Sequence, residues 1–289
     1  MAMLACAALF MFVDRRTAPI ILWDESRLAI NALEMAERGW SLSTTYGFVP
    51  DLWNTKPPLM IWLMTASIHA FGPSELALRL PSMIAALGTL AIVFAFTRRV
   101  TRSLPAAAFA LVLLAISVGF YGEHGARTAD YDALLCFFTT AYLALFHRAV
   151  HRRRPGWPLL LLAFAAVVAA AMTKTVAAIV SGMGVALYLL IAGRLGRVLA
   201  NPRYAVLMML ALVPLAVFYL AREAGGPGYL SAVWFNDFAG RVRNDLDPLD
   251  TRPWYHLETV FLYPMLSAGP LALLAPLALK RARGPRRQA

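Results

Sequence analysis

The chain has 289 residues, of which 60% are hydrophobic. Its mean hydropathy of +0.62 excludes an ordinary soluble domain, whose apolar content is ~45–50%. The formal net charge is +11, but the basic residues stand in short clusters between apolar runs, which argues against nucleic-acid binding and for membrane loops. Cys6 and Cys136 both lie in apolar runs, so the sequence indicates neither a disulfide framework nor a cysteine-rich metal site.

Several apolar runs approach the ~20 residues that a membrane-spanning helix needs. The candidate spans are residues 1–13, 80–96, 104–121, 133–146, 158–172, 176–192, 204–221 and 257–279. The first is short, but it lacks the basic start and the small-residue cleavage pattern of a signal peptide, and we interpret it as a span. The predicted fold class is therefore all-α: a polytopic transmembrane bundle of about eight spans, forming a single domain.

The apolar run 57–71 decides the topology. If it lies at the membrane surface, the clusters at Arg98, Arg148, Arg194 and Lys280 all fall on one side, which then holds 15 of the 27 Lys and Arg residues. The positive-inside bias identifies that side as cytoplasmic. All 16 Asp and Glu residues fall on the other side. We therefore predict that 57–71 is an interfacial or re-entrant helix on the outer face, and that both termini are cytoplasmic.

The first outer loop, residues 14–79, contains two polar segments, 23–27 and 54–58. Residues 26–38 predict a juxtamembrane helix with one apolar face, in which Asp24 stands at the N-cap position. Proline is well suited to the start of a helix, so the Pro57-Pro58 pair predicts that Lys56 lies at the entrance of the next helix, at the membrane surface.

The other outer segments are also polar. The second outer loop, 122–132, is short and dense in charge. Lys174 is the only charge in the outer turn between the predicted spans 158–172 and 176–192. The last outer loop, 222–256, carries Asp237 and further charges after a glycine-rich start. Because these segments converge on one membrane face by topology, they offer carboxylates and cations for a reaction on a phosphate-bearing partner. The carboxylates are Asp24, Glu25, Asp130 and Asp132, and the cations are Arg27, Lys56, Arg127 and Lys174.

These motifs resemble a known family. Asp24-Glu25-Ser26-Arg27, Lys56-Pro57-Pro58-Leu59 with Trp62, and Arg79-Leu80-Pro81-Ser82 occur in this order. The set resembles the GT-C superfamily of polyprenyl-phosphate-sugar-dependent glycosyltransferases, in particular the branch of the lipid A aminoarabinose transferase and the protein O-mannosyltransferases. The likeness covers residues 1–174 well and 222–280 loosely.

The resemblance implies a catalytic carboxylate at Asp24, with Glu25 as its neighbour, and lipid-phosphate contacts at Arg27 and Lys56. It implies a second acidic position after Arg127, where Asp132 fits better than Asp130, and a further phosphate contact at Lys174. Thr55 departs from the acidic residue associated with a metal in the aminoarabinose branch, so no cofactor is indicated beyond an optional divalent metal. The family usually adds further spans, so we expect a fragment or a compact variant.

The hypothesis is an inverting glycosyltransferase. The expected donor is a polyprenyl-phosphate sugar, and the expected acceptor is a lipid, a glycan or a protein. We expect a multi-pass protein of the inner (plasma) membrane, in contact with membrane lipids and not with nucleic acid, with its active site on the periplasmic side. The other function classes are a transporter or flippase, and a non-catalytic or truncated homologue.

Several residues also have structural interpretations. Asp24 is suited to capping a helix, and Glu25 to favouring a helix amino terminus. Arg127 with Asp130 or Asp132 fits a structural ion pair, and Lys56 and Lys174 fit interfacial anchors.

Overall fold

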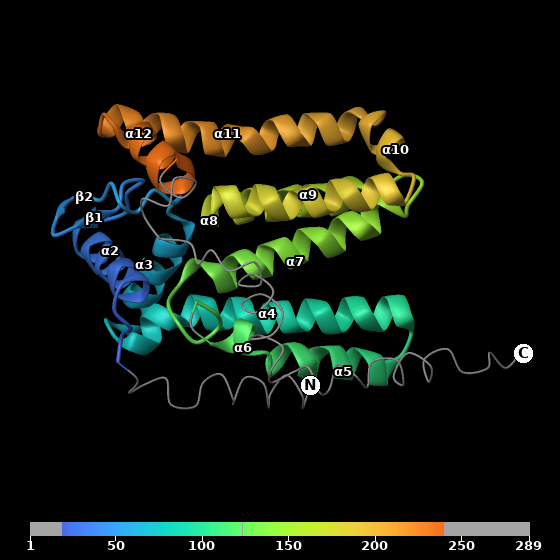
Figure 1. Ribbon diagram of the computed structural model, residues 1–289, viewed down its shortest axis with the longest axis horizontal. Coiled ribbons are helices and arrows are strands. Elements are labelled where there is room, and N and C mark those ends of the chain that lie inside the picture. The colour runs from blue at the N-terminus through green and yellow to red at the C-terminus, as the bar shows by residue number, and fades with distance from the viewer. Residues whose placement is uncertain (1–18, 123, 240–289) are drawn as a thin grey trace, which may run out of the picture.

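The computed structural model describes residues 19–122 and 124–239. Within these ranges the chain is almost entirely helical (Figure 1), which confirms the predicted fold class. Six of the predicted spans fall on described residues, whereas 1–13 and 257–279 lie outside them. By length and composition, three described helices qualify as membrane spans: α4 (Glu75–Thr101), α7 (Tyr131–Val150) and α11 (Pro202–Gly225).

Shorter apolar helices complete the bundle: α5 (Leu104–Ala115), α8 (Trp157–Thr173) and α9 (Thr175–Ile191). The predicted span 104–121 is interrupted, because the chain leaves the helix at Ile116 and Ser117 and resumes it in the short α6 (Val118–Tyr121). The chain runs back and forth between two ends of the bundle (Figure 1). The Arg98, Arg148 and Arg194 clusters lie in the connections at one end, which we name the basic end.

The opposite end, which we name the acidic end, carries the elements between the spans. These are α2 (Asp24–Arg38), α3 (Leu59–Phe71), the strands β1 (Thr45–Tyr46) and β2 (Val49–Pro50), α12 (Tyr229–Trp234) and the π-helical turn η1 (Phe235–Ala239) (Figure 1). Helix α10 (Leu195–Leu199) lies at the basic end. Helix α3, which forms all but the first two residues of the run 57–71, packs on α2 and α4 at the acidic end.

Four packed clusters hold the described part of the bundle together, and the smallest of them joins α8, α11 and α12. The apolar face of α2, with Leu28, Ala32 and Met35, packs against Met60 and Met64 of α3 and against the start of α7. The other two clusters join α7 to α8 and α11, and α4 to α5. Burying these faces against one another fixes α2 and α3 on the ends of α4 and α7, and this arrangement positions the polar residues of the acidic end.

The two-residue hairpin is a feature that the sequence did not indicate. Strands β1 and β2 pair antiparallel, with Tyr46 opposite Val49. Gly47 and Phe48 between them both have φ of 63°, as a type I′ turn requires at its two central positions. Buried Glu34 of α2 accepts hydrogen bonds from the Thr45 hydroxyl and from the backbone N–H of Phe48, so α2 holds the hairpin in place.

Candidate active site

The residues singled out in the sequence lie at two cavities near the start of α7: Asp24 and Asp130 line one, and Lys56 and Lys174 line the other. The Lys174 Nζ donates to Asp132 Oδ1 at 2.7 Å, and the Lys56 Nζ lies 5.5 Å from the centre of the Tyr131 ring. The charges of Asp24 and Lys174 both act on the Lys56 ammonium. Residues from α2, the 51–58 loop, α7 and the α8–α9 turn therefore share one electrostatic environment.

Asp24 lines a cavity of about 470 Å³ together with Trp23, His124, Thr128 and Asp130. The predicted N-cap role of Asp24 is wrong, because α2 begins at Asp24 itself and Trp23 occupies the cap position without a side-chain bond. The Asp24 side chain is 61% exposed, and its nearest charged neighbour is His124 Nδ1 at 3.7 Å. This carboxylate is therefore accessible to a molecule that enters the cavity.

His124 and Asp130 form the far wall of this cavity. His124 Nδ1 lies 2.5 Å from Asp130 Oδ2, and the other Asp130 oxygen accepts the N–H of Tyr131 at the start of α7. The hydrogen bond that His124 donates to Asp130 raises the pKa of His124 to about 9, and the nearby charges of Asp130, Asp24 and Asp132 act in the same direction. Burial would raise the pKa of Asp130, but its bonds to His124 and Tyr131 outweigh burial and lower it. The pair is therefore an imidazolium and a carboxylate at neutral pH.

We expect His124 to stabilise the folded protein at neutral pH and to lose this effect in alkali. Its folded pKa of about 9 lies above the ordinary 6.5, so the contribution is complete below pH 6.5 and disappears as the pH rises through about 9. A His124→Gln variant should melt at a lower temperature than the wild type below pH 6.5, and the two should converge above the folded pKa. A melting difference that stays constant with pH would contradict the ion pair.

Glu25 is buried directly beside Asp24 and has all its acceptor positions occupied. Arg79 Nε donates to Oε1 at 2.7 Å and Arg79 NH2 to Oε2 at 2.9 Å. The backbone N–H groups of Ala129 and Ile21 donate to the same two oxygens. Burial alone would raise the pKa of Glu25, but these hydrogen bonds lower it. Glu25 thus ties the start of α2 to α4 and to the second outer loop, a structural position rather than a reactive one.

Lys56 and Lys174 line a second cavity, of about 190 Å³, with Thr175, Tyr219 and Asp237. Among the described residues, no carboxylate lies at ion-pair distance from the Lys56 Nζ. Burial, and then the like charge of Lys174, lower the pKa of Lys56. Two cations that repel each other across a small cavity, one of them without a bound carboxylate, form a site suited to an anion.

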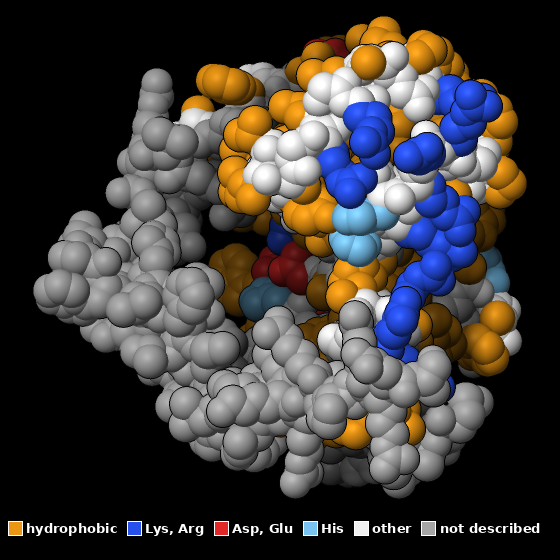
Figure 2. Space-filling model, turned by 90° about the vertical axis from the view of Figure 1, so that its right-hand side faces the viewer, with side chains coloured by type: hydrophobic (Ala, Val, Ile, Leu, Met, Phe, Trp, Pro, Cys, Tyr) orange, Lys and Arg blue, Asp and Glu red, His pale blue; other side chains and the backbone are white. Residues whose placement is uncertain are grey.

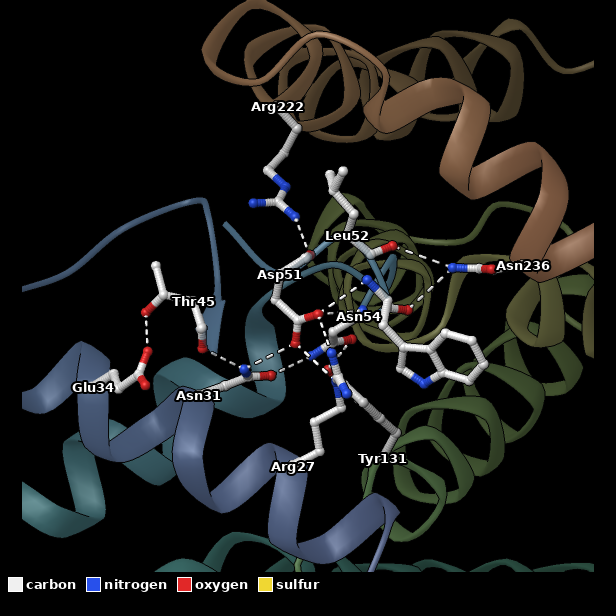
Figure 3. A network of polar contacts seen from close by, with 11 residues as sticks. Arg27, Asn31, Glu34, Thr45, Asp51, Leu52, Asn54, Tyr131, Arg222 and Asn236 are labelled. Atoms are coloured by element: carbon white, nitrogen blue, oxygen red, sulfur yellow. Dashed lines mark hydrogen bonds and ion pairs between the residues drawn. The ribbon is translucent and has the colours of Figure 1, made fainter. Parts of the chain in front are cut away.

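Asp51 organises the loop that carries Lys56 (Figure 3). Its carboxylate, which is fully buried, accepts both Nε and NH2 of Arg27, at 3.0 and 2.6 Å. It also accepts Asn31 Nδ2 and the backbone N–H groups of Trp53 and Asn54. Burial works to raise the pKa of Asp51, but these donors lower it. Arg27 is therefore engaged with Asp51 and lines neither cavity, although a phosphate contact was expected of it.

The end of α11 and the start of α12 hold the same loop from above (Figure 3). Arg222 NH2 donates to the Asp51 carbonyl at 3.2 Å, and the Tyr229 hydroxyl donates to the Thr55 carbonyl at 2.6 Å. The Thr55 hydroxyl in turn lies 3.3 Å from both oxygens of Asp237. These bonds fix the segment that leads into Lys56, from Asp51 to Thr55.

The remaining predicted cation, Arg127, lies elsewhere. Its guanidinium stands over the Tyr121 ring at 5.2 Å, and it lines neither cavity. Neither Asp130 nor Asp132 forms an ion pair with Arg127 within the described residues: Asp130 pairs with His124, and Asp132 with Lys174. The structure thus places Asp24 and Asp130 at one cavity and Lys56 and Lys174 at another, with Asp132 bonded to Lys174 and Arg127 at neither.

The donors for a divalent metal ion are present at the first cavity. Ligand atoms of Asp24, His124 and Asp130 all lie within 4.8 Å of one another, and carboxylate oxygen with imidazole nitrogen suits Zn²⁺ or Mn²⁺. The imidazole must first lose its proton and its bond to Asp130, so protons and metal compete for the site. An ion held there would supply positive charge beside Asp24.

Sequence reasoning missed several residues of this site. The position of Arg79 indicates a structural role, since an arginine at the start of an apolar run requires a buried partner. Asp51 and Asn54 gave none, because a polar loop residue looks the same whether it is buried or solvated. Nothing in the sequence around His124 indicates a role, and only its contact with Asp130 distinguishes it.

Comparison with known proteins gives a family and a fold. Residues 55–220 match the family described as dolichyl-phosphate-mannose-protein mannosyltransferase. An uncharacterized protein of Aquifex aeolicus (strain VF5) is 28% identical over 190 residues, which make up 66% of this chain and 37% of that protein.

Two crystal structures of ArnT from Cupriavidus metallidurans are similar to this chain. The structure bound to undecaprenyl phosphate matches with a TM-score of 0.73 at 22% identity, and the apo structure with a TM-score of 0.68 at 19% identity. Both matches cover 99% of this chain, but only 51% and 55% of the ArnT chains. The chain thus spans about half the length of ArnT, and the likeness shows a shared fold.

Proposed function

Because the chain belongs to the dolichyl-phosphate-mannose-protein mannosyltransferase family, as the motifs in its sequence predicted, we propose that it is a membrane glycosyltransferase. It takes a sugar from a polyprenyl-phosphate-linked donor and transfers it to an acceptor hydroxyl. The ArnT structure of the same fold was solved with undecaprenyl phosphate bound, which supports a polyprenyl phosphate as the carrier. Transfer takes place at the acidic end, on the extracytoplasmic face of the inner membrane.

The observation that carries the proposal is the Lys56 ammonium, half-buried and without a carboxylate partner among the described residues. Lys174 lines the same 190 Å³ cavity. Cations in a partly dehydrated site stabilise phosphate more strongly than they do in water. We assign the phosphate of the donor to this cavity, where its charge relieves the repulsion between the two lysines.

Asp24 acts as the general base. It is the exposed carboxylate of the neighbouring cavity, and it takes the proton from the acceptor hydroxyl as the oxygen attacks the anomeric carbon. The bond between that carbon and the phosphate oxygen breaks, and the electron pair leaves with the polyprenyl phosphate. Attack opposite the leaving group inverts the configuration of the sugar.

The start of α7 contributes one carboxylate near each cavity. Asp130 lines the first, whereas Asp132 bonds Lys174 of the second. Asp132 therefore orients Lys174 toward the departing phosphate. From its position in the first turn of α7, Asp132 also contacts the sugar of the donor. Glu25 and Arg27, which are engaged with Arg79 and Asp51, belong to the scaffold that positions Asp24 and Lys56.

A Lys56→Met variant is expected to bind polyprenyl phosphate about tenfold to a hundredfold more weakly, because a hydrogen bond to a charged group contributes about 1.5–3 kcal/mol. Titration of the purified protein in detergent, by calorimetry or tryptophan fluorescence, measures the change. Arg38→Gln is the matched control, because it removes an exposed cation from the same end. Equal affinity of the Lys56→Met variant and the wild type would remove Lys56 from the site.

The structure offers less support for a transporter. In the described membrane helices α4, α7 and α11, each Asp, Glu, Lys and Arg lies near a helix end, whereas a transport path needs ionisable groups near the middle of the membrane. A non-catalytic homologue would bind the donor without turning it over, and the binding titration combined with a transfer assay separates that class from an enzyme.

A further inference from the structure

A further cavity, separate from the two at the candidate active site, lies toward the basic end of the bundle. It has a volume of about 450 Å³ and is lined by α4, α7 and α9. Helix α7 lies between α4 and α9 (Figure 1) and packs on both, so α7 forms the floor and the other two helices form the walls. The lining includes Phe96, Ala144, Val150 and Leu189 and has no acidic or basic residue other than His147. We name this cavity the apolar groove.

The groove has the dimensions of a hydrocarbon chain. Its floor residues run from Thr140 to Val150 along α7, which is about 15 Å at 1.5 Å per residue. Its walls are the candidate span α4 and the apolar helix α9, and an apolar lining of this kind is suited to the hydrocarbon part of a membrane. At one end the His147 ring packs against Phe96 at 5.1 Å and against His151 at 4.3 Å. These aromatic and imidazole rings mark the transition from apolar lining to polar surface.

A small basic hollow adjoins that end of the groove. It is lined by Arg152, Arg153, Arg194 and Arg197, and it shares Val150 with the groove. Arg194 NH1 donates to the Val150 carbonyl at 2.7 Å, which fixes that guanidinium at the junction. Figure 2 views this face and shows Lys and Arg side chains gathered over it, with histidine among them. The described connections at this end, residues 96–104, 146–157 and 191–203, contain no Asp or Glu.

We propose that the apolar groove and the basic hollow together bind one anionic phospholipid. An acyl chain lies in the groove over Ala144, and the phosphate lies against Arg194 and the neighbouring arginines. The argument is charge complementarity: an apolar channel of chain length adjoins a hollow whose charged lining residues are all arginines, and this matches an amphiphile with a negative head. The site is independent of the proposed sugar transfer, because it lies at the other end of the bundle.

Native mass spectrometry of the full chain in detergent tests the site, with dioleoyl phosphatidylglycerol and dioleoyl phosphatidylethanolamine as probes. The wild type should bind phosphatidylglycerol more tightly, and Arg194→Gln should lower that affinity about fivefold while leaving phosphatidylethanolamine unchanged. Ala144→Trp, which fills the groove, should weaken both lipids. The matched controls are Arg98→Gln, an exposed cation at the same end, and Leu162→Trp, an exposed apolar position on α8. Neither should change binding.

Two results would overturn the proposal. Equal binding of the two lipids by the wild type would show that the basic hollow does not select a negative head. Unchanged phosphatidylglycerol binding by Ala144→Trp would show that the groove is not the site, as when the chain's own residues 257–279 fill it. If Ala144→Trp unfolds at a lower temperature than the wild type, Ala144→Phe provides the same test with a smaller ring, and Arg194→Gln tests the head group independently.

Discussion

Replacing Asp24 with asparagine should lower the rate of sugar transfer by about 10²–10⁴-fold, which is the usual contribution of a general base. The substitution keeps the shape of the side chain and removes its ability to take a proton. Because Asp24 is exposed and does not belong to the packed core, the variant should fold as the wild type does. It should also bind polyprenyl phosphate with wild-type affinity. Transfer is measured with purified protein, a polyprenyl-phosphate sugar and envelope acceptors, by mass spectrometry of the glycosylated products.

Glu37→Gln is the control for this experiment, since it removes an exposed carboxylate from the same helix. It should retain wild-type transfer. If the Asp24→Asn variant also retained transfer, the base would have to be sought elsewhere. If it lost transfer together with donor binding, Asp24 would be part of the donor site instead.

Replacing Arg79 with methionine should destabilise the protein by about 3–5 kcal/mol, because it leaves the Glu25 carboxylate buried without its partner. Both side chains of this pair are almost fully buried, so water cannot replace the lost bonds. The measurement is the free energy of unfolding in mixed micelles of mild detergent and dodecyl sulfate. Arg99→Met, at an exposed position on the same helix, should change that free energy little.

A second substitution separates the charge from the packing. Glu25→Gln combined with Arg79→Met removes both charges and should recover part of the lost stability, since the cost of a broken pair is mainly the unpaired charge. If Arg79→Met alone were as stable as the wild type, the Glu25–Arg79 pair would not be what holds α2 against α4.

The fold was predictable because each apolar run indicates a helix by its own composition, and the arginine clusters together indicate the topology. Apolar runs locate most spans, and the arginine clusters assign all described connections at the basic end to one side. The family was predictable because its motifs are short and ordered, and the match over residues 55–220 confirms that interpretation. The break between α5 and α6 was missed because residues 104–121 carry no charge, although Ser117 stands at the interruption and Gly119 just after it.

The candidate site was predictable in its membership more than in its roles. The sequence brings Asp24, Lys56 and Lys174 to one face through topology alone. It does not say that Arg27 meets Asp51 or that Glu25 meets Arg79, since those partners are 24 and 54 residues away along the chain. Pairing decides whether a charge is available to a ligand, and pairing is a property of the packed structure.

The bonds that hold the loop around Lys56 have a consequence for biosynthesis. Arg222, Tyr229 and Asn236 reach back to this loop across sequence separations of 171, 174 and 184 residues. At ~5–20 residues per second, the ribosome delivers these partners roughly 10–35 s after the loop itself. A nascent chain already inserted in the membrane therefore lacks the contacts that hold the Lys56 loop until α12 and η1 emerge, so this cavity is completed late in synthesis.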